Sequence, residues 1–433
     1  MAIIVNNISA PLEMKSEEVI GKALRLCGLR AGNALRADIY KTSLDARRRG
    51  SIHFVHSVYI ELQDPAAEKK ICDKLSFCRF AEPAVIMPVF GENRPEGRVV
   101  IAGFGPAGMF AALLLARYGY RPLVLEKGAS VDERTALVKR FWNTGELDER
   151  TNVQFGEGGA GTFSDGKLTT RINDSRCRFV LETFAQFGAD KSVLTKAKPH
   201  IGTDVLREVV KNMRGEIISL GGEVCFETPL TGVNIENGSI KSVLSGRGEE
   251  QCAALIAAVG HSAHDTLRLL HGTGIQLEPK AFSVGARIEH KQSAVDASLY
   301  GKAAGNPLLP VGEYQLSHHT ATGRGVYTFC MCPGGTVVAA ASSEGRVVTN
   351  GMSEFSRSGD NANAAVAVSV TPDDFEGVFG GVELQAQIER AAYSAAHDYI
   401  APATTVGGFL SGKPTLKNAS VKPTYQRESR LTS

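Results

Sequence analysis

The feature that most constrains the fold of this 433-residue chain is a glycine motif that directly follows a short apolar segment. Residues 99–102 are continuously apolar, as a buried parallel strand is, and lead into the sequence GFGPAG at residues 103–108. Residues 109–116 are apolar on nearly every side, which is typical of a helix buried within an α/β layer. Strand, GxGxxG and helix in this order predict a Rossmann-like unit that binds a dinucleotide.

Each residue of this motif has a separate expected role. Gly103 permits the tight turn, Gly105 lets a pyrophosphate approach the backbone, and Gly108 lets the helix pack on the strand. Pro106 and Ala107 open the helix, whose N-terminal N–H groups and positive dipole end favour a phosphate. The motif therefore predicts where the pyrophosphate of the cofactor binds.

An acidic residue ends the next predicted strand. Residues 122–125 are expected to form that strand and to deliver Glu126, which stands 18 residues past Gly108. We expect its carboxylate to accept both hydroxyls of an adenosine ribose and to disfavour a 2′-phosphate. Lys127 is assigned to the same predicted site.

A second glycine-rich stretch, FGEGGAGTFSDG at residues 155–166, contains five glycines. It follows a long excursion, VDERTALVKRFWNTG, instead of a regular βαβ succession. This order favours FAD over NAD, because a flavin cofactor extends away from the first helix and bare backbone can lie against it. Thr162 and Ser164 are expected to donate hydrogen bonds there, and Lys167 is a candidate for stabilising the anionic reduced flavin.

The predicted fold class is α/β, with a Rossmann-like domain, an inserted β-rich domain and a small amino-terminal α+β domain. The small domain, of ferredoxin-like type, spans residues 1–90 and has one helix capped by Ser16 and another opened by Asp64 and Pro65. A polar linker is expected at residues 91–97.

Three further segments follow the linker. Residues 98–266 predict the FAD-binding domain, in which an apolar strand at residues 253–259 ends at Gly260 and returns the chain to the cofactor. Residues 267–400 predict a substrate domain with several strands and one helix, and residues 401–433 predict the start of a return to the FAD domain. A hairpin turn is expected at Asn237-Gly238.

Candidate catalytic residues are few. His318, with His319 beside it, is expected in a polar loop and is a candidate for proton transfer. Cys330 and Cys332 are predicted to lie on opposite faces of a strand and therefore not to form a disulfide with each other. No residue spacing indicates a metal site.

The amino-acid composition limits the classes of partner that this chain is expected to bind. The formal net charge of +2, from 48 basic and 46 acidic residues, gives no indication of nucleic acid or a charged membrane surface, so a small-molecule substrate is expected. Eight scattered cysteines, the lack of a signal peptide and the lack of a long apolar run predict a cytoplasmic protein with reduced thiols. The oligomeric state is left open.

The chain resembles the predicted FAD-dependent dehydrogenases of bacteria, an uncharacterised branch of the glutathione-reductase-like flavoproteins. The resemblance covers nearly the whole chain. It rests on GFGPAGMFAALLLARYG, GEGGAGTFSDGKL, AAVGHSAHDT, FSVGARIEH and GVYTFCMCPGGTVVAAASSEGRVVTNGMSEFSRSGDNANAAVAVSV. It implies non-covalent FAD at Gly103, Gly105, Gly108 and Glu126. The following residues are implied more loosely: Gly158 and Gly159 beside the flavin, and Arg134 either at the pyrophosphate or on a helix surface.

The expected function is therefore an FAD-dependent oxidoreductase that transfers hydride through flavin N5 to or from an unidentified substrate. No second strand-GxGxxG-helix unit is present, so NAD(P)H is expected either to bind transiently as the electron donor or to be the substrate. Two alternatives stay open: a flavoprotein that acts on RNA through its amino-terminal domain, and a flavin-binding protein without catalytic activity.

The end of the chain departs from the resemblance. After Gln426 the sequence closes with RESRLTS, where the family is expected to continue into another glycine-rich stretch that returns to the flavin. We expect a chain without that stretch to bind FAD weakly and to have little activity.

Overall fold

The computed structural model describes residues 2–81, 91, 97–170, 172 and 174–425, and the backbone of residues 429–431. Most of the predicted linker and most of the RESRLTS segment lie outside the described residues. The chain forms two compact units, the first of Met1–Phe90, Lys167–Ile201 and Ser293–Gly312, the second of Gly91–Gly166, Gly202–Gln292 and Glu313–Ser433. Within the described part, every helix is too short or too polar to cross a membrane.

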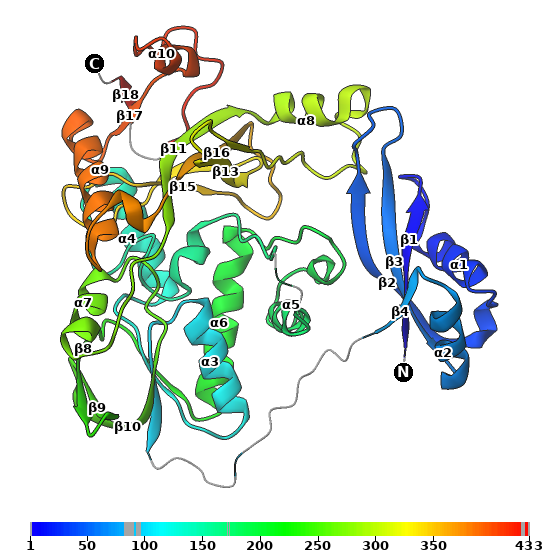
Figure 1. The fold of residues 1–433 in the computed structure, drawn as a ribbon, viewed down its shortest axis with the longest axis horizontal. Coiled ribbons are helices and arrows are strands. Elements are labelled where there is room, and N and C mark those ends of the chain that lie inside the picture. Colours follow the sequence, from blue (N-terminus) through cyan, green and yellow to red (C-terminus); the bar gives the residue numbers. More distant parts are fainter. Residues whose placement is uncertain are drawn as a thin grey trace. The chain divides into compact units, whose positions relative to one another are not determined.

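The first unit contains an antiparallel sheet of order β2-β3-β1-β4, with α1 and α2 beside it (Figure 1). α2 begins as predicted, because the Asp64 carboxylate accepts a hydrogen bond of 2.9 Å from the Ala66 N–H. Ser16 is not the cap of α1: Lys15 holds that position and Ser16 is the first helical residue. The elements are β1 (Ile3–Ala10), α1 (Ser16–Leu26), β2 (Ala34–Asp45), β3 (His53–Leu62), α2 (Pro65–Lys74), β4 (Cys78–Phe80), α5 (Arg176–Gln186) and α8 (Gln292–Tyr300), whose first residue belongs to the second unit.

The second unit contains a six-stranded sheet of order β7-β6-β5-β10-β9-β8. Strands β7, β6, β5 and β10 are parallel, whereas β10, β9 and β8 run antiparallel. The β8–β9 turn is at Asn237 and Gly238 as predicted, and both have positive φ, 51° and 75°. The elements are β5 (Arg98–Ala102), α3 (Pro106–Arg117), β6 (Leu123–Leu125), α4 (Val131–Thr144), α6 (Thr203–Ser219), β7 (Glu223–Cys225), β8 (Leu230–Glu236), β9 (Ser239–Ser245), β10 (Gly248–Ala257) and α7 (His264–Gly272).

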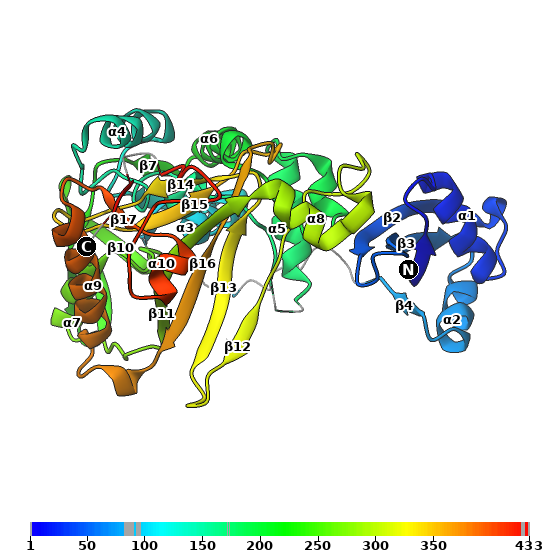
Figure 2. The same cartoon turned by 90° about the horizontal axis from the view of Figure 1, so that it is seen from above.

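The rest of the second unit is built on an antiparallel sheet of order β11-β16-β13-β12, whose strands lie side by side in Figure 2. Of the several strands and one helix expected within residues 267–400, the strands correspond to β11, β13, β14 and β16 and the helix to α9. His318 and His319 lie in the edge strand β12, so their predicted placement in a loop is wrong. The elements are β11 (Phe282–Lys291), β12 (Ser317–His319), β13 (Gly325–Cys332), β14 (Thr336–Ala339), β15 (Thr349–Met352), β16 (Asn361–Val370), α9 (Gly380–Ala396), β17 (Ala401–Ala403), α10 (Val406–Leu410) and β18 (Ser429–Leu431).

Candidate cofactor-binding site

The carboxyl ends of β5, β6 and β10 form the candidate site. β5 lies between β6 and β10, so the strand order reverses at β5. In open parallel sheets, ligands usually bind at the carboxyl ends of the strands where the strand order reverses. The loop after β5 touches the segment after β10: a Cβ on Gly103 would lie 2.4 Å from the Ala258 carbonyl oxygen. Gly103 also has a φ of 97°, so this position requires glycine on two grounds.

The other two glycines of the motif differ in what surrounds them. A Cβ on Gly108 would lie 2.0 Å from the Gly103 carbonyl oxygen and 3.4 Å from the Ile101 side chain of β5, so Gly108 lets α3 pack closely on the loop that follows this strand. A Cβ on Gly105 would meet nothing nearer than the Gly159 Cα, at 3.7 Å. Pro106 and Ala107 are exposed. The amino terminus of α3 is therefore open to a ligand, and Gly105 leaves space in front of it.

The second glycine-rich stretch packs against the first. The Gly158 N–H donates to the Phe104 carbonyl at 2.9 Å, and a Cβ on Gly159 would lie 3.0 Å from the Gly105 Cα. Gly158 has a φ of 85°, and its Cβ would lie 2.0 Å from the Thr162 hydroxyl oxygen. Bare backbone is needed here because two loops meet with no room for side chains between them.

Glu126 lies at the end of β6, where it holds backbone N–H groups of both glycine loops. Its carboxylate accepts from Phe104 at 2.7 Å, from Gly128 at 2.8 Å and from Gly156 at 3.1 Å. Its side chain is buried, with 5% of the residue exposed. This carboxylate is thus a structural acceptor in addition to its predicted role toward a ribose.

Arg134 of α4 is fully buried, so its predicted alternative on a helix surface is wrong. Its guanidinium donates four hydrogen bonds of 2.6–3.3 Å to the carbonyls of residues 152, 153, 156 and 157, and lies 4.9 Å from the Phe163 ring centroid. Burial lowers the pKa of Arg134 to about 9. Any effect on a pyrophosphate is therefore indirect, through the loop that Arg134 holds.

Two other predicted donors are engaged inside the second loop. The Thr162 hydroxyl is fully buried and donates to the Glu157 carbonyl at 3.3 Å. The Ser164 hydroxyl donates to the Gly161 carbonyl at 2.7 Å. Both hydroxyls were predicted to donate to a cofactor. In this structure they donate within the loop itself and stabilise it.

The remaining predicted residues lie in different places. The Lys127 ammonium pairs with Asp265 at 2.9 Å and lies 4.5 Å from the Phe155 ring centroid. Gly260 is exposed just past β10 and has space for a ligand beside it, since a Cβ added there would meet no neighbouring atom within 4 Å. Lys167 forms a backbone β-bridge with His200 in the first unit, and His318 is exposed in the second unit.

Two ion pairs around the second loop were missed by sequence reasoning. Buried Glu157 accepts from the Val131 N–H at 2.7 Å and pairs with Arg214 of α6 at 2.9 Å. Buried Asp165 accepts two hydrogen bonds from Arg357, which also lies 3.8 Å from Glu313. Acidic residues inside an otherwise small and apolar stretch could have indicated buried ion pairs. Their partners, however, are distant in the sequence and could not be identified from it.

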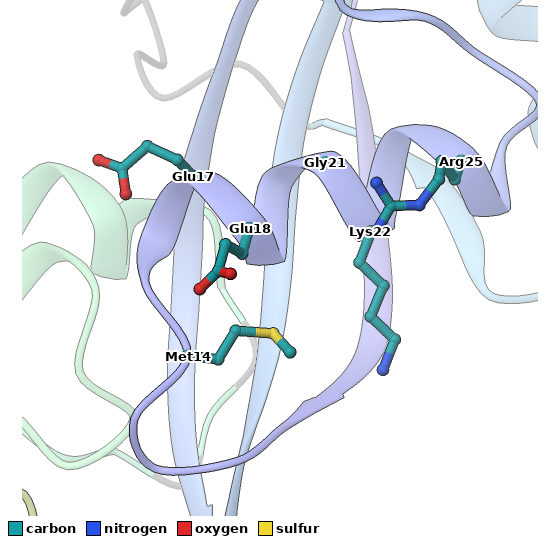
Figure 3. A pocket seen from close by; sticks show the side chains of 6 residues that line it. All are labelled: Met14, Glu17, Glu18, Gly21, Lys22 and Arg25. Atoms are coloured by element: carbon teal, nitrogen blue, oxygen red, sulfur yellow. The ribbon is translucent and has the colours of Figure 1, made fainter.

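A shallow hollow in the first unit is not a candidate for this chemistry (Figure 3). It lies over α1, where Glu18 accepts from the Lys15 N–H and Lys22 donates to the Ser9 carbonyl. These two side chains therefore stabilise the start of α1 and its contact with β1. The lining residues are Met14, Glu17, Glu18, Gly21, Lys22 and Arg25.

Sequence comparisons place the chain among bacterial relatives. A protein of Clostridium beijerinckii described only as uncharacterised is 43% identical over 431 residues, which cover 98% of this chain and 80% of that protein. The chain belongs to the family of this protein. Residues 281–433 also match the family model described as "FAD-dependent protein, C-terminal domain-like".

Comparison with solved structures gives only weak similarity. The L-amino acid deaminase of Proteus vulgaris is 13% identical, with 56% of this chain and 62% of that chain covered and a TM-score of 0.27. A geranylgeranyl bacteriochlorophyll reductase-like protein of Thermoplasma acidophilum is 14% identical, with 67% of this chain and 61% of that chain covered and a TM-score of 0.32. The chain thus spans less than two thirds of either structure.

Proposed function

We propose that this protein binds FAD at the carboxyl ends of β5, β6 and β10 and is an oxidoreductase acting on a small molecule. The observation that carries the proposal is the open amino terminus of α3, with Gly105 bare and Pro106 and Ala107 exposed, at the carboxyl end of β5 between its parallel neighbours β6 and β10. The carboxyl-terminal match to an FAD-dependent family supports the choice of cofactor.

Different groups of the chain would bind the pyrophosphate and the ribose of the cofactor. The N–H groups at the amino terminus of α3 would hold the pyrophosphate, since they combine donors with a positive dipole end. Glu126 would receive the ribose. A carboxylate offers about four acceptor sites, and three backbone N–H groups already use this one. We therefore expect one ribose hydroxyl, and not both, to bond directly to Glu126.

A bound flavin would supply hydride transfer at N5, a reaction that no side chain can perform. The protein would orient the cofactor through its two glycine loops, which Glu126 joins and Arg134 fixes from the interior. We assign this role to a glutathione-reductase-like domain at residues 98–266, with residues 267–400 as the substrate domain; residues 167–201 and 293–312 within these ranges belong to the first compact unit. NADH or NADPH is the proposed transient electron donor.

The test is a titration of FAD into the purified, cofactor-stripped protein, followed by the quenching of flavin fluorescence. Saturable binding by the wild type, and its loss in Gly105→Val, is the expected result. Failure of the wild type to bind, or equal binding by the variant, would contradict the assigned site. Anaerobic mixing of the loaded protein with NADH or NADPH then tests the reaction, with bleaching of the flavin's visible absorption expected for at least one donor.

A further inference from the structure

The two compact units carry formal charges of opposite sign. The first unit, of residues 1–90, 167–201 and 293–312, contains 21 lysines and arginines against 14 aspartates and glutamates, whereas the second contains 27 against 32. The near-neutral total of +2 is therefore made of +7 in the first unit and −5 in the second. Positive charge concentrated in one part of a chain favours a polyanionic partner for that part.

The sheet of the first unit has one face that points away from its helices. In β3, Val58 and Ile60 belong to the core that the sheet forms with α1 and α2 (Figure 1). Side chains alternate along a strand, so Tyr59 lies on the opposite face. Tyr59 is in register with Ile4 of β1, which in turn is in register with Arg79 of β4. Arg79 is exposed, so this second face reaches solvent.

Two tyrosine rings on the second face lie beside arginine side chains. The Arg36 guanidinium of β2 is 5.5 Å from the Tyr59 ring centroid. The Tyr40 ring has two guanidiniums near it, that of Arg79 at 5.9 Å and that of Arg178 of α5 at 5.7 Å. Both tyrosines are only partly buried, and the Arg36 side chain is 66% exposed. Aromatic rings and guanidinium planes are the protein surfaces on which unpaired bases stack.

Further basic side chains lie around β2. Lys41 is exposed and in register with Ser57, a residue of the second face. The Thr42 N–H donates to the carbonyl of residue 195 at 2.6 Å, and a bridge between Thr42 and Lys196 places this exposed lysine at the edge of β2. The connection from β2 to β3 contains three consecutive exposed arginines, residues 47–49. These side chains provide the charge that phosphates require.

Four acidic residues lie beside these basic ones. Asp38 pairs with Arg36, Asp45 with Arg47 and Glu182 with Arg178, and Glu61 is in register with Arg36. The eight basic residues are Arg36, Lys41, Arg47, Arg48, Arg49, Arg79, Arg178 and Lys196. The charge around the second face is therefore positive on balance.

We propose that the face formed by Arg36, Tyr40, Lys41, Tyr59, Arg79 and Arg178 docks single-stranded RNA. The lysine and arginine side chains bind phosphates, and the tyrosine rings with their neighbouring guanidiniums stack on bases. Rings paired with guanidiniums favour RNA over an acidic protein, because bases stack on both groups whereas carboxylates bond only to the guanidiniums. Single strands with accessible bases are typical of RNA loops and ends. This docking does not require FAD.

The probe is a fluorescein-labelled single-stranded RNA of mixed sequence and about 20 nucleotides, which is longer than the site of one small domain. The full-length protein is titrated into it and binding is followed by fluorescence anisotropy at several salt concentrations. The logarithm of the association constant should fall linearly with the logarithm of the salt concentration. We expect a slope of about −2 or steeper, since each of three or more phosphates contributes about −0.7.

Two pairs of variants separate stacking from charge. Tyr59→Ala should weaken binding about tenfold with an unchanged salt slope, because a stacked base is lost but no phosphate contact, whereas Tyr59→Phe keeps the ring and should bind as the wild type does. Lys41→Gln should weaken binding and make the slope shallower by about 0.7. Lys70→Gln, at an exposed position of α2, should change neither quantity. Because Lys41 is exposed, its variant tests the face even if Tyr59→Ala unfolds the first unit.

Several outcomes would overturn the proposal. They are a lack of binding at low ionic strength, equal binding of a duplex RNA of the same length, and wild-type affinity in both Tyr59→Ala and Lys41→Gln. Binding of poly-glutamate without binding of RNA would assign the face to an acidic protein. Tighter binding of single-stranded DNA of the same sequence would contradict the choice of RNA.

Discussion

At the scale of single residues, the three glycines of one motif fall into two groups. Gly103 and Gly108 are surrounded by backbone atoms that a Cβ would strike, at 2.4 Å and 2.0 Å. Gly105 has an extended conformation, with φ −77° and ψ −174°, and space beside it. The first two positions therefore serve the fold, and the third is free to serve a ligand.

Gly105→Val should abolish FAD binding and leave stability nearly unchanged, because valine adopts this conformation and its side chain fills the space in front of α3. Gly108→Val is the matched comparison and should unfold this region, since its Cβ would overlap the Gly103 carbonyl oxygen. Urea unfolding followed by the fluorescence of the single tryptophan, Trp142, reports on the second unit. If Gly105→Val were as destabilising as Gly108→Val, the distinction between the two positions would be lost.

Glu126→Ala should destabilise the cofactor-free protein as well as weaken FAD binding. Removal of the carboxylate leaves three buried N–H groups, of Phe104, Gly128 and Gly156, without their acceptor. Each such loss costs about 1–3 kcal/mol, so we expect a decrease in the free energy of unfolding of at least that size. The same tryptophan-detected unfolding, performed without FAD, measures it. An unchanged cofactor-free stability would mean that Glu126 serves only the ligand.

At the scale of elements, α4 stabilises the second glycine loop from inside the protein. Arg134 donates to four loop carbonyls, and Arg140 of the same helix is exposed and pairs with Glu146. Helix and loop are adjacent in sequence order but share no regular secondary structure. Arg134 supplies four of the hydrogen bonds between them, and the Val131 N–H at the start of α4 supplies another, to the Glu157 carboxylate.

Arg134→Met should loosen that loop, because methionine fills much of the volume but donates no hydrogen bond to the four carbonyls. Hydrogen exchange of the amides of residues 152–158 should become about tenfold faster or more, equivalent to about 1.4 kcal/mol of lost protection. Arg140→Met is the control on the same helix and should leave these amides unaffected. Equal exchange in wild type and Arg134→Met would show that the loop does not need the guanidinium.

Glu157 should give the protein a distinct pH dependence. Burial raises the pKa of Glu157 above its ordinary value of 4.5, so the folded state binds more protons than the unfolded state between that value and the raised one. The contribution of Glu157 to the free energy of unfolding is therefore largest below pH 4.5 and falls as the pH rises from 4.5 to the raised pKa. The difference in stability between wild type and Glu157→Gln, measured across this pH range, should fall with rising pH. If the difference in the free energy of unfolding between the two proteins did not change with pH, the pKa of Glu157 would not be raised.

At the scale of the whole second unit, a buried ion pair joins segments that are 192 residues apart in the sequence. Asp165 ends the second glycine stretch, and Arg357 follows β15 in the sequence. Their bidentate contact ties the candidate cofactor loop to the part of the chain that holds the carboxyl-terminal sheet. The geometry of one region therefore depends on the other.

Asp165→Ala and Arg357→Ala should each destabilise the second unit by about 3–5 kcal/mol, because each removes the bidentate contact of a buried charge. The double variant should cost clearly less than the sum of the two, as expected for residues in direct contact. The exposed pair Arg324 and Asp374, 2.7 Å apart, is the control and should contribute about 1 kcal/mol or less. Additive losses in the tryptophan-detected unfolding would contradict a direct coupling.

The sequence by itself determined what depends on neighbouring residues. The apolar strand before Gly103, the cap at Asp64 and the turn at Asn237-Gly238 are present as predicted, because dihedral preference, capping and hydrophobic periodicity act over a few residues. The errors at this scale, Ser16 as a cap and the loop at His318, concern element boundaries, which packing shifts by a residue or a short strand.

Only the tertiary structure decided which groups meet. From the sequence, Arg134 is expected either at the pyrophosphate or on a helix surface, yet it lies in the interior because a loop folded over it offers four carbonyls. The partners of Glu126 and Asp165 depend likewise on chain reversals that no local preference specifies. Hydrogen bonds and ion pairs act over about 3 Å, so residues far apart in sequence acquire such roles only when the fold brings them within that distance.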